Sequence, residues 1–288
     1  VGRHGHPLLK TPHQDALHDQ SVRFDRFYVS PSCSPTRAAL LTGMHEFRNG
    51  VTHTQVPREQ LWKDATTLPQ FLATAGYRTG FIGKWHMGGE SDRPQPGWDH
   101  WVSFAGQGEY LPPTPDYTLN VDGKRVKQKG YITNELTDYA IDWLKQQKPA
   151  EKPFFLYLSH KAVHANFTPE DKYEDSLKDL PFQRVASEQE TARDTLKPRW
   201  LRDQRNSWHG VDFPYHSDLD IERYYKRYCE TLLAVDDSVG RILAELKAKG
   251  VHDDTLILYL GDNGFMFGEH GLIDKRVAYE ESIRVPLL

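Results

Sequence analysis

The chain has 288 residues, which suits one large α/β domain and excludes a small scaffold that depends on disulfides. Hydrophobic residues make up 38% of it and aromatic residues 12%, enough for a core and too many for a wholly disordered chain. The 36 basic and 40 acidic side chains give a net charge of -4 with no basic block, which argues against nucleic acid as a partner. No apolar run approaches the roughly 20 residues of a membrane-spanning helix, so no membrane span is predicted.

The sequence contains two cysteines, Cys33 and Cys229, almost two hundred positions apart. This spacing excludes a disulfide framework and a cysteine-based zinc site. Cys229 lies within a predicted helix and is expected to be a buried core thiol. The chain begins with Val1 rather than Met and stops inside an apolar run, so we expect both ends to be truncated.

Strands and helices alternate along the chain. In order, the patterns predict strand 22–29, helix 68–75, strand 77–82, helix 132–144, strand 154–158, helix 220–249 and strand 255–260. Pro69 and Gly76 delimit the first helix, and Gly250 ends the last one. Helices between short apolar strands indicate an α/β fold with a mainly parallel central sheet and helices on both faces.

Two long segments, 88–130 and 165–219, interrupt this alternation and are rich in Pro, Gly, Trp and charge. Both exceed ordinary connections, so we predict excursions that shape a cleft within one domain covering 1–288. Trp98, Trp101 and Tyr110 lie in the first excursion, where packing is favoured over a platform for a sugar ring. The charged stretch 188–205 is predicted to be solvated surface.

Polar residues cluster where each predicted strand ends. In chain order these are Cys33-Ser34-Pro35-Thr36-Arg37, then Gly83-Lys84-Trp85-His86, then His160, Lys161 and His164, then Gly261-Asp262-Asn263-Gly264. The carboxyl ends of parallel strands meet at one edge of a sheet, so one cleft could hold all four groups. Asn263-Gly264 alone would indicate a simple turn, but its place after an apolar strand favours a functional role.

The segment Cys33-x-Pro35-x-Arg37, followed by Ala-Ala-Leu-Leu-Thr-Gly at 38–43, resembles the signature of the type I sulfatases. Further blocks of that family match in order, at 83–88, 262–264, 268–271 and Lys275, so the resemblance covers nearly the whole chain. It implies an alkaline phosphatase-like fold. Residues 95–110 and 279–284 are similar to bacterial sulfatases that act on glycans, including N-acetylglucosamine-6-sulfate types.

The resemblance implies an arylsulfatase-like sulfuric ester hydrolase that removes sulfate from a sulfated glycan or a small sulfate ester. It further implies that Cys33 is oxidised to Cα-formylglycine by a formylglycine-generating enzyme or an anaerobic sulfatase-maturing enzyme. Export to the periplasm or the extracellular space is expected from the family. Two alternatives stay open: a phosphomonoesterase or phosphonate-type hydrolase of the same superfamily, and a noncatalytic glycan-binding homologue.

Hydrolysis of a sulfate monoester needs a nucleophile, neutralisation of anionic oxygens and protonation of the leaving oxygen. A hydrated aldehyde at position 33 would carry two hydroxyls, one to attack sulfur and one through which sulfate is expelled. The resemblance implies that Arg37 and Lys84 hold this hydrate and that His86 accepts its proton. It implies that His164 and Lys275 grip sulfate and protonate the leaving alcohol, with His160 as an alternative to His164.

The resemblance also implies one Ca²⁺ ion bound by Asp262, Asn263 and the side chain at Cys33. Carboxylate and amide oxygens suit this hard cation, but two residues cannot supply a shell of six to eight oxygens. In the family an Asp-Asp pair at the end of the first strand adds ligands, and nothing before Gly5 matches it. We therefore expect that the first strand and a C-terminal subdomain are missing from this chain, or that it is metal-deficient.

Overall fold

The computed structural model describes residues 1–6, 8–190, 196–212 and 217–288. They form two compact units. The sheet unit comprises Ser32–Ala162 and Val235–Ile257, and the hairpin unit comprises Val1–Pro31, Val163–Ala234 and Leu258–Leu288. Over the described ranges, no helix is both long enough and apolar enough to cross a membrane.

The sheet unit is built on five strands in the order β4-β3-β2-β1-β5. They are β1 (Arg78–Gly83), β2 (His100–Ser103), β3 (Thr118–Val121), β4 (Lys124–Lys127) and β5 (Phe154–Ser159). Strand β1 pairs parallel with β2 and β5, whereas β2 with β3 and β3 with β4 pair antiparallel. The α/β prediction is confirmed, but the prediction of a mainly parallel sheet is wrong because the sheet is mixed.

Strands 77–82 and 154–158 were predicted from sequence and are confirmed as β1 and β5. The remaining three strands lie in the segment 88–130, where no strand was predicted. Strand β4 reads Lys-Arg-Val-Lys and lies at the sheet edge with mostly exposed side chains, so it lacks the apolar signal of a buried strand.

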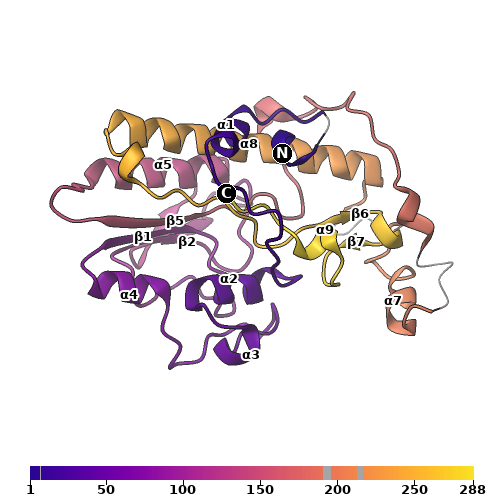
Figure 1. Ribbon diagram of the computed structural model, residues 1–288, viewed down its shortest axis with the longest axis horizontal. Coiled ribbons are helices and arrows are strands. Elements are labelled where there is room, and N and C mark those ends of the chain that lie inside the picture. Colours follow the sequence, from indigo (N-terminus) through magenta and orange to yellow (C-terminus); the bar gives the residue numbers. More distant parts are fainter. Residues whose placement is uncertain (7, 191–195, 213–216) are drawn as a thin grey trace. The chain divides into compact units, whose positions relative to one another are not determined.

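Helices cover both faces of this sheet (Figure 1), as the sequence predicts. On one face lie α2 (Cys33–Thr42), α4 (Leu68–Thr74) and the short α3 (Glu46–Asn49); on the other lie α5 (Ile132–Gln146) and residues 235–248 of α8 (Ile221–Ala248). Successive side chains of β1 point to opposite faces of the sheet, so each face packs against its own set of helices. Phe81 packs with Ala38 and Leu41 of α2, whereas a Cβ at Gly80 would lie 2.9 Å from the Trp143 ring of α5.

The predicted helices begin and end close to where their sequence signals lie. A capping box at Thr67 starts α4, with the Thr67 backbone N–H donating to Gln70 Oε1 at 2.8 Å. Gly250 follows α8 in a left-handed conformation, which suits a residue without a Cβ. The Thr137 and Ser238 hydroxyls lie 2.6 Å apart and join α5 to α8. All three helix predictions are confirmed.

In the part of the hairpin unit that the structure describes, β6 (Met266–Phe267) forms a short antiparallel pair with β7 (Ile273–Asp274). Among the described residues, its helices are α1 (Pro12–Asp19), α7 (Arg199–Gln204), α9 (Glu280–Ile283) and residues 221–234 of α8. Its 3₁₀ turns include η1 (Gly2–His4), η2 (Asp171–Tyr173), η3 (Ala186–Gln189) and η5 (Glu269–Gly271), whereas η4 (His252–Asp254) belongs to the sheet unit. Its core includes Phe167, Tyr224, Phe267 and Ile273. Glu188 is also buried, and its carbonyl accepts from Arg205 at 2.6 Å. The stretch 188–205 was predicted to be solvated surface, and its described part is therefore not all solvated. Residues 191–195 of this stretch lie outside the described residues, and so do residues 213–216 of the predicted excursion 165–219.

The predicted strands 22–29 and 255–260 are wrong. Each run makes one isolated antiparallel bridge, Tyr28 with Arg284 and Leu260 with Leu287, so residues 283–288 bond to both runs. The backbone pairing is confined to 24–29 and to 259–261. The rest of each run lacks a ladder of backbone hydrogen bonds and therefore forms no regular strand. In the second run, Leu256 has 85% of its surface exposed.

Candidate active site

Cys33 is the first residue of α2, and only 2% of its surface is exposed. It follows Ser32, which is extended and makes no side-chain cap bond. The first N–H groups of a helix lack intrahelical partners and carry the positive end of the helix dipole. The fold therefore places residue 33 where an anionic oxygen or sulfur is stabilised.

Cys229 differs in its environment, although it is equally buried with 1% exposure. Burial within α8 raises the pKa of its thiol to about 11. It is therefore a protonated core thiol at neutral pH, which agrees with the sequence prediction.

His86 brings an imidazole to Cys33. The Sγ atom of Cys33 lies 3.2 Å from His86 Nδ1, and Ser34 Oγ lies 3.0 Å from the same nitrogen. The Ser34 hydroxyl also donates to the His86 carbonyl at 2.6 Å. Burial is the main cause that lowers the pKa of His86, which favours the neutral ring. Two predicted site residues are thus in contact, and Ser34 joins them without a sequence signal beyond its position beside Cys33.

The second ring nitrogen of His86 contacts a residue that sequence reasoning did not identify. The side-chain Nε2 of Gln107 lies 2.8 Å from His86 Nε2. Gln107 belongs to the loop between β2 and β3, in the segment where no strands were predicted. Its only sequence signal is its position between Gly106 and Gly108, which both have positive φ values.

Arg37 joins α2 to the ends of two strands. Its guanidinium donates to the Lys84 carbonyl at 2.7 Å and to Ser159 Oγ at 2.6 Å, and it is 6% exposed. Lys84 directly follows β1 and Ser159 ends β5. These contacts bring together Arg37 within α2, Lys84 after β1 and Ser159 at the end of β5 in the sheet unit. Lys84 is 2% exposed, so its cationic side chain is buried there.

Lys161 is a further buried cation at this end of the sheet, and the sequence analysis gave it no role. It is 5% exposed and donates to the Gln107 carbonyl at 3.3 Å. Its ammonium lies 4.7 Å from the ring centroid of Tyr110, a cation–π distance. Burial lowers the pKa of Lys161 to about 8.

The alternative histidine, His160, contacts the helical layer instead of Cys33. Its Nε2 lies 2.9 Å from Ser238 Oγ of α8, and burial lowers the pKa of His160 to about 4. The aromatic residues of the first excursion pack, as predicted. Trp101 stacks on Phe81 with centroids 4.5 Å apart, and Tyr110 is only 4% exposed.

The other predicted site residues lie in the hairpin unit. His164 Nδ1 lies 2.6 Å from the Ala165 carbonyl, so Nδ1 carries the proton that it donates. Lys275 follows β7 and is 6% exposed. Asn263 donates from Nδ2 to the Gly264 carbonyl at 2.8 Å, while its Oδ1 is buried without a hydrogen-bond partner. The predicted residues therefore form two groups, one in each unit.

The residues present meet the requirements of Ca²⁺ only in part. Asp262 and Asn263 are neighbouring oxygen donors, and the unpartnered Asn263 Oδ1 is suited to a ligand. Among the described residues, however, no group of three or more His, Cys, Asp or Glu could hold a metal ion. The described residues thus do not complete a calcium shell, and no chemical step below passes through the metal.

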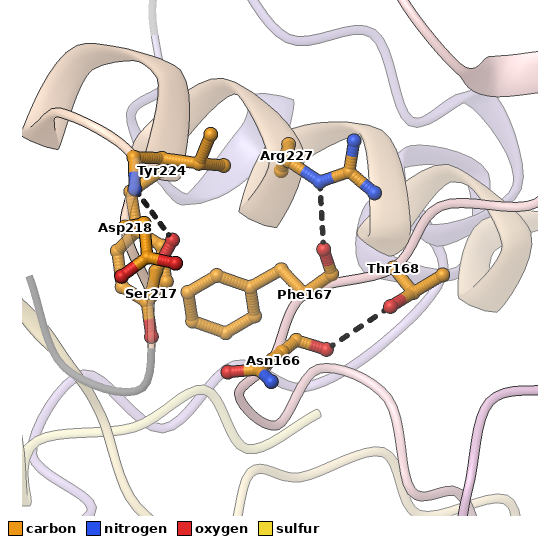
Figure 2. A pocket seen from close by; sticks show the side chains of 8 residues that line it. Asn166, Phe167, Thr168, Ser217, Asp218, Tyr224 and Arg227 are labelled. Carbon is orange, nitrogen blue, oxygen red and sulfur yellow. Dashed lines mark hydrogen bonds between the residues drawn. The ribbon is translucent and has the colours of Figure 1, made fainter.

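The hairpin unit also contains a cavity of about 350 Å³ (Figure 2). Its lining consists of Asn166, Phe167, Thr168, Ser217, Asp218, Leu219, Tyr224 and Arg227. The Phe167 and Tyr224 rings lie 4.6 Å apart, and Arg227 Nε donates to the Phe167 carbonyl at 3.0 Å. The first lining residue, Asn166, lies two positions after His164 in the chain. None of the predicted site residues lines the cavity.

Known proteins resemble this chain over nearly its whole length. An N-acetylglucosamine-6-O-sulfatase of Bacteroides thetaiotaomicron is 32% identical over 341 residues, which cover 99% of this chain and 59% of that protein. An N-acetylglucosamine-6-sulfatase of Capra hircus is 29% identical and covers 98% of this chain and 52% of its own length. The chain thus spans little more than half of these relatives.

A solved structure of BT4656 in complex with its substrate D-glucosamine-2-N,6-O-disulfate superposes with a TM-score of 0.81. It is 30% identical and covers 100% of this chain and 67% of that one. The family described as Sulfatase matches residues 1–288. This chain therefore belongs to the sulfatase family.

Proposed function

We propose that this protein is a sulfuric ester hydrolase that removes sulfate from a carbohydrate through a formylglycine made from Cys33. The observation that carries the proposal is the contact between residue 33 and His86, 3.2 Å apart at the N-terminus of α2, in a member of the sulfatase family. A formylglycine hydrate at position 33 supplies one hydroxyl to attack sulfur and a second through which sulfate is expelled.

In this proposal His86 accepts the proton of the second hydroxyl. The neutral imidazole has a lone pair to accept it, and the lowered pKa keeps the ring neutral at the pH where most enzymes work. The ring nitrogen that lies toward residue 33 is Nδ1, which is 3.2 Å from Cys33 Sγ and 3.0 Å from Ser34 Oγ.

The N-terminus of α2 and nearby cations neutralise the developing negative charge. Arg37 lies one turn along α2 from Cys33, and Lys84 lies two residues before His86. Both are buried, where an electrostatic interaction is stronger than in water. Because the Arg37 guanidinium already donates to Lys84 and Ser159 of the protein, it is held in place before substrate binds. This preorganisation supports its assignment as a residue that holds the hydrate.

For the hairpin unit we propose that His164 and Lys275 bind sulfate and that one of them protonates the leaving alcohol. Nδ1 of His164 donates to the Ala165 carbonyl, so we assign the proton transfer to its Nε2. Asp262 and Asn263 would be oxygen ligands of a Ca²⁺ ion, which would neutralise the charge of sulfate, with further ligands from outside this set.

The proposed substrate is a sugar that carries a 6-O-sulfate on a glucosamine unit. Two relatives are named as N-acetylglucosamine-6-sulfatases, and the superposed structure holds D-glucosamine-2-N,6-O-disulfate. The cavity of the hairpin unit offers aromatic rings beside polar groups, a lining typical of carbohydrate sites. Its place after His164 in the chain is compatible with this assignment.

The test compares the full-length protein with the variant Cys33→Ala after coexpression with a formylglycine-generating enzyme. We expect sulfate release from N-acetylglucosamine-6-sulfate and from an aryl sulfate, with a loss of at least about a thousandfold in Cys33→Ala. Faster release of phosphate from an aryl phosphate would favour the phosphomonoesterase alternative. Binding of the sulfated sugar without turnover in either form would favour the noncatalytic alternative.

A further inference from the structure

We propose that the cavity of the hairpin unit is a subsite for an uncharged sugar unit joined to the sulfated one. This inference deepens the proposed function and rests on it for the identity of the substrate. The juxtaposition that carries it is a polar cavity of about 350 Å³ whose lining begins at Asn166, two residues after His164 in the same unit. The proposed function needs only one sulfated sugar, and the subsite extends the substrate to an oligosaccharide.

The cavity lies near a residue that we assign to the leaving alcohol, namely His164. Consecutive Cα atoms of a chain are about 3.8 Å apart, so the Cα of Asn166 lies within about 7.6 Å of the Cα of His164. The leaving alcohol is the carbohydrate part of the sulfate ester. A neighbouring sugar unit of the same glycan is therefore within reach of this cavity.

The size and the apolar part of the lining suit one sugar ring. Ligand cavities usually measure roughly 300–1,000 Å³, and about 350 Å³ lies at the lower end of this range. Figure 2 shows the Phe167 ring at the centre of the lining, with polar side chains around it. Phe167 and Tyr224 are only 3% and 1% exposed, so their rings pack beneath the cavity. Recognition of a ligand is thus left to the polar side chains.

Three polar side chains of the lining have unused capacity for hydrogen bonds. Within the described ranges, the side chains of Asn166 and Asp218 make no hydrogen bond or ion pair. Arg227 donates from Nε to the Phe167 carbonyl at 3.0 Å and from Nη1 to Glu174 at 3.3 Å, which leaves Nη2 for a ligand. Sugar hydroxyls both donate and accept, so an amide, a carboxylate and a guanidinium edge can bind neighbouring hydroxyls.

The charges of the lining favour an uncharged ligand. The lining contains one acidic and one basic side chain, Asp218 and Arg227, and the basic one already pairs with Glu174 at 3.3 Å. A sulfate or carboxylate group in the cavity would lie near the unpaired Asp218 carboxylate, which repels it. None of the cations that we assign to sulfate lines the cavity. The chemistry of the lining thus fits a neutral sugar and disfavours a second anionic one.

The kinetic test compares substrates on the full-length, formylglycine-containing protein. The substrates are N-acetylglucosamine-6-sulfate and two disaccharides that carry galactose on one or the other side of this sugar. We expect KM to be roughly tenfold lower for one of the disaccharides with a similar kcat, because a distant subsite binds substrate and transition state alike. Asp218→Ala should remove this gain and leave KM for the monosaccharide within about twofold. Asp179→Ala is the matched control, because both aspartates are exposed in the hairpin unit and Asp179 does not line the cavity.

A binding measurement separates this inference from the proposed function. Calorimetry titrates the full-length Cys33→Ala protein with the unsulfated form of the preferred disaccharide, so no turnover is needed. We expect binding that is weakened about tenfold by Asp218→Ala, unchanged by Asp179→Ala, and weaker when glucuronic acid replaces galactose.

Equal KM values for the monosaccharide and both disaccharides, or binding that Asp218→Ala does not change, would overturn the subsite. Tighter binding of the disaccharide with glucuronic acid would overturn its preference for an uncharged sugar. If the wild type hydrolyses no sulfate ester, the proposed function fails, while calorimetry with both unsulfated disaccharides still decides this inference.

Discussion

Lys161 shows how one buried cation can make stability depend on pH. Burial lowers its pKa to about 8 in the folded chain, compared with 10.5 for an ordinary lysine. Between these two values the unfolded chain binds more protons than the folded chain, so the free energy of unfolding rises with pH. Below pH 8 the cost of burying the charged ammonium is fully present, and the Tyr110 ring and the Gln107 carbonyl partly offset it.

The variant Lys161→Met removes this titration. We expect the free energy of unfolding of the wild type to gain about 2 kcal/mol relative to Lys161→Met between pH 8 and pH 10. Urea unfolding of both proteins at several pH values measures the difference. A difference that is constant over this range would show that Lys161 titrates normally. Lys148→Met serves as the control because Lys148 is exposed in its ion pair with Glu151.

Sequence reasoning identified the residues whose chemistry is distinctive and missed those that act through hydrogen bonds alone. Cys33, Arg37 and His86 follow a motif, and the structure brings them together around α2 and β1. Ser34 and Gln107 are common residue types, so only the fold reveals that both contact the His86 ring. The roles assigned to individual site residues stay predictions.

At the scale of elements, the junction where β1 and β5 end holds the active-site residues in register. The Lys84 backbone N–H donates to the Ser159 carbonyl at 2.7 Å, directly after Gly83. Gly83 has a φ of 122°, and a Cβ there would overlap the Ser159 carbonyl oxygen. Only glycine lets these two strand ends approach so closely.

The variant Gly83→Ala should therefore separate the ends of β1 and β5. We expect a loss of more than about 2 kcal/mol in the free energy of unfolding and a large loss of activity, because Lys84 and Ser159 shift with the strands. Gly130→Ala is the control, since a Cβ at Gly130 meets nothing within 4 Å. Thermal unfolding and turnover of the two variants measure both effects, and equal behaviour would contradict the proposed role of Gly83.

The elements differ in how well the sequence predicts them, for a physical reason. Helices α4, α5 and α8 carry local signals, namely amphipathic spacing and the residues at their ends, and these were sufficient. Strands depend on partners distant in the sequence. The apolar run at 255–260 satisfies the strand pattern, yet it pairs only near its end with residues 286–288 and forms no regular strand. Strand β4 forms despite a polar sequence because it pairs with β3 at the sheet edge.

At the scale of the whole molecule, family membership and the local geometry of the sheet unit support the same function. The family match covers residues 1–288, and the sheet unit holds residue 33 at a helix N-terminus against His86. The residues proposed to bind calcium and the leaving group belong to the hairpin unit. The sequence motifs predicted both groups, because each motif is local.

The central claim is that residue 33 acts as a formylglycine. The most direct measurement correlates the fraction of Cys33 converted, determined by mass spectrometry of its peptide, with the rate of sulfate release across preparations of the full-length protein that differ in conversion. We predict a rate proportional to the converted fraction, with a line through the origin. A rate that stays unchanged as conversion falls to zero would contradict the account.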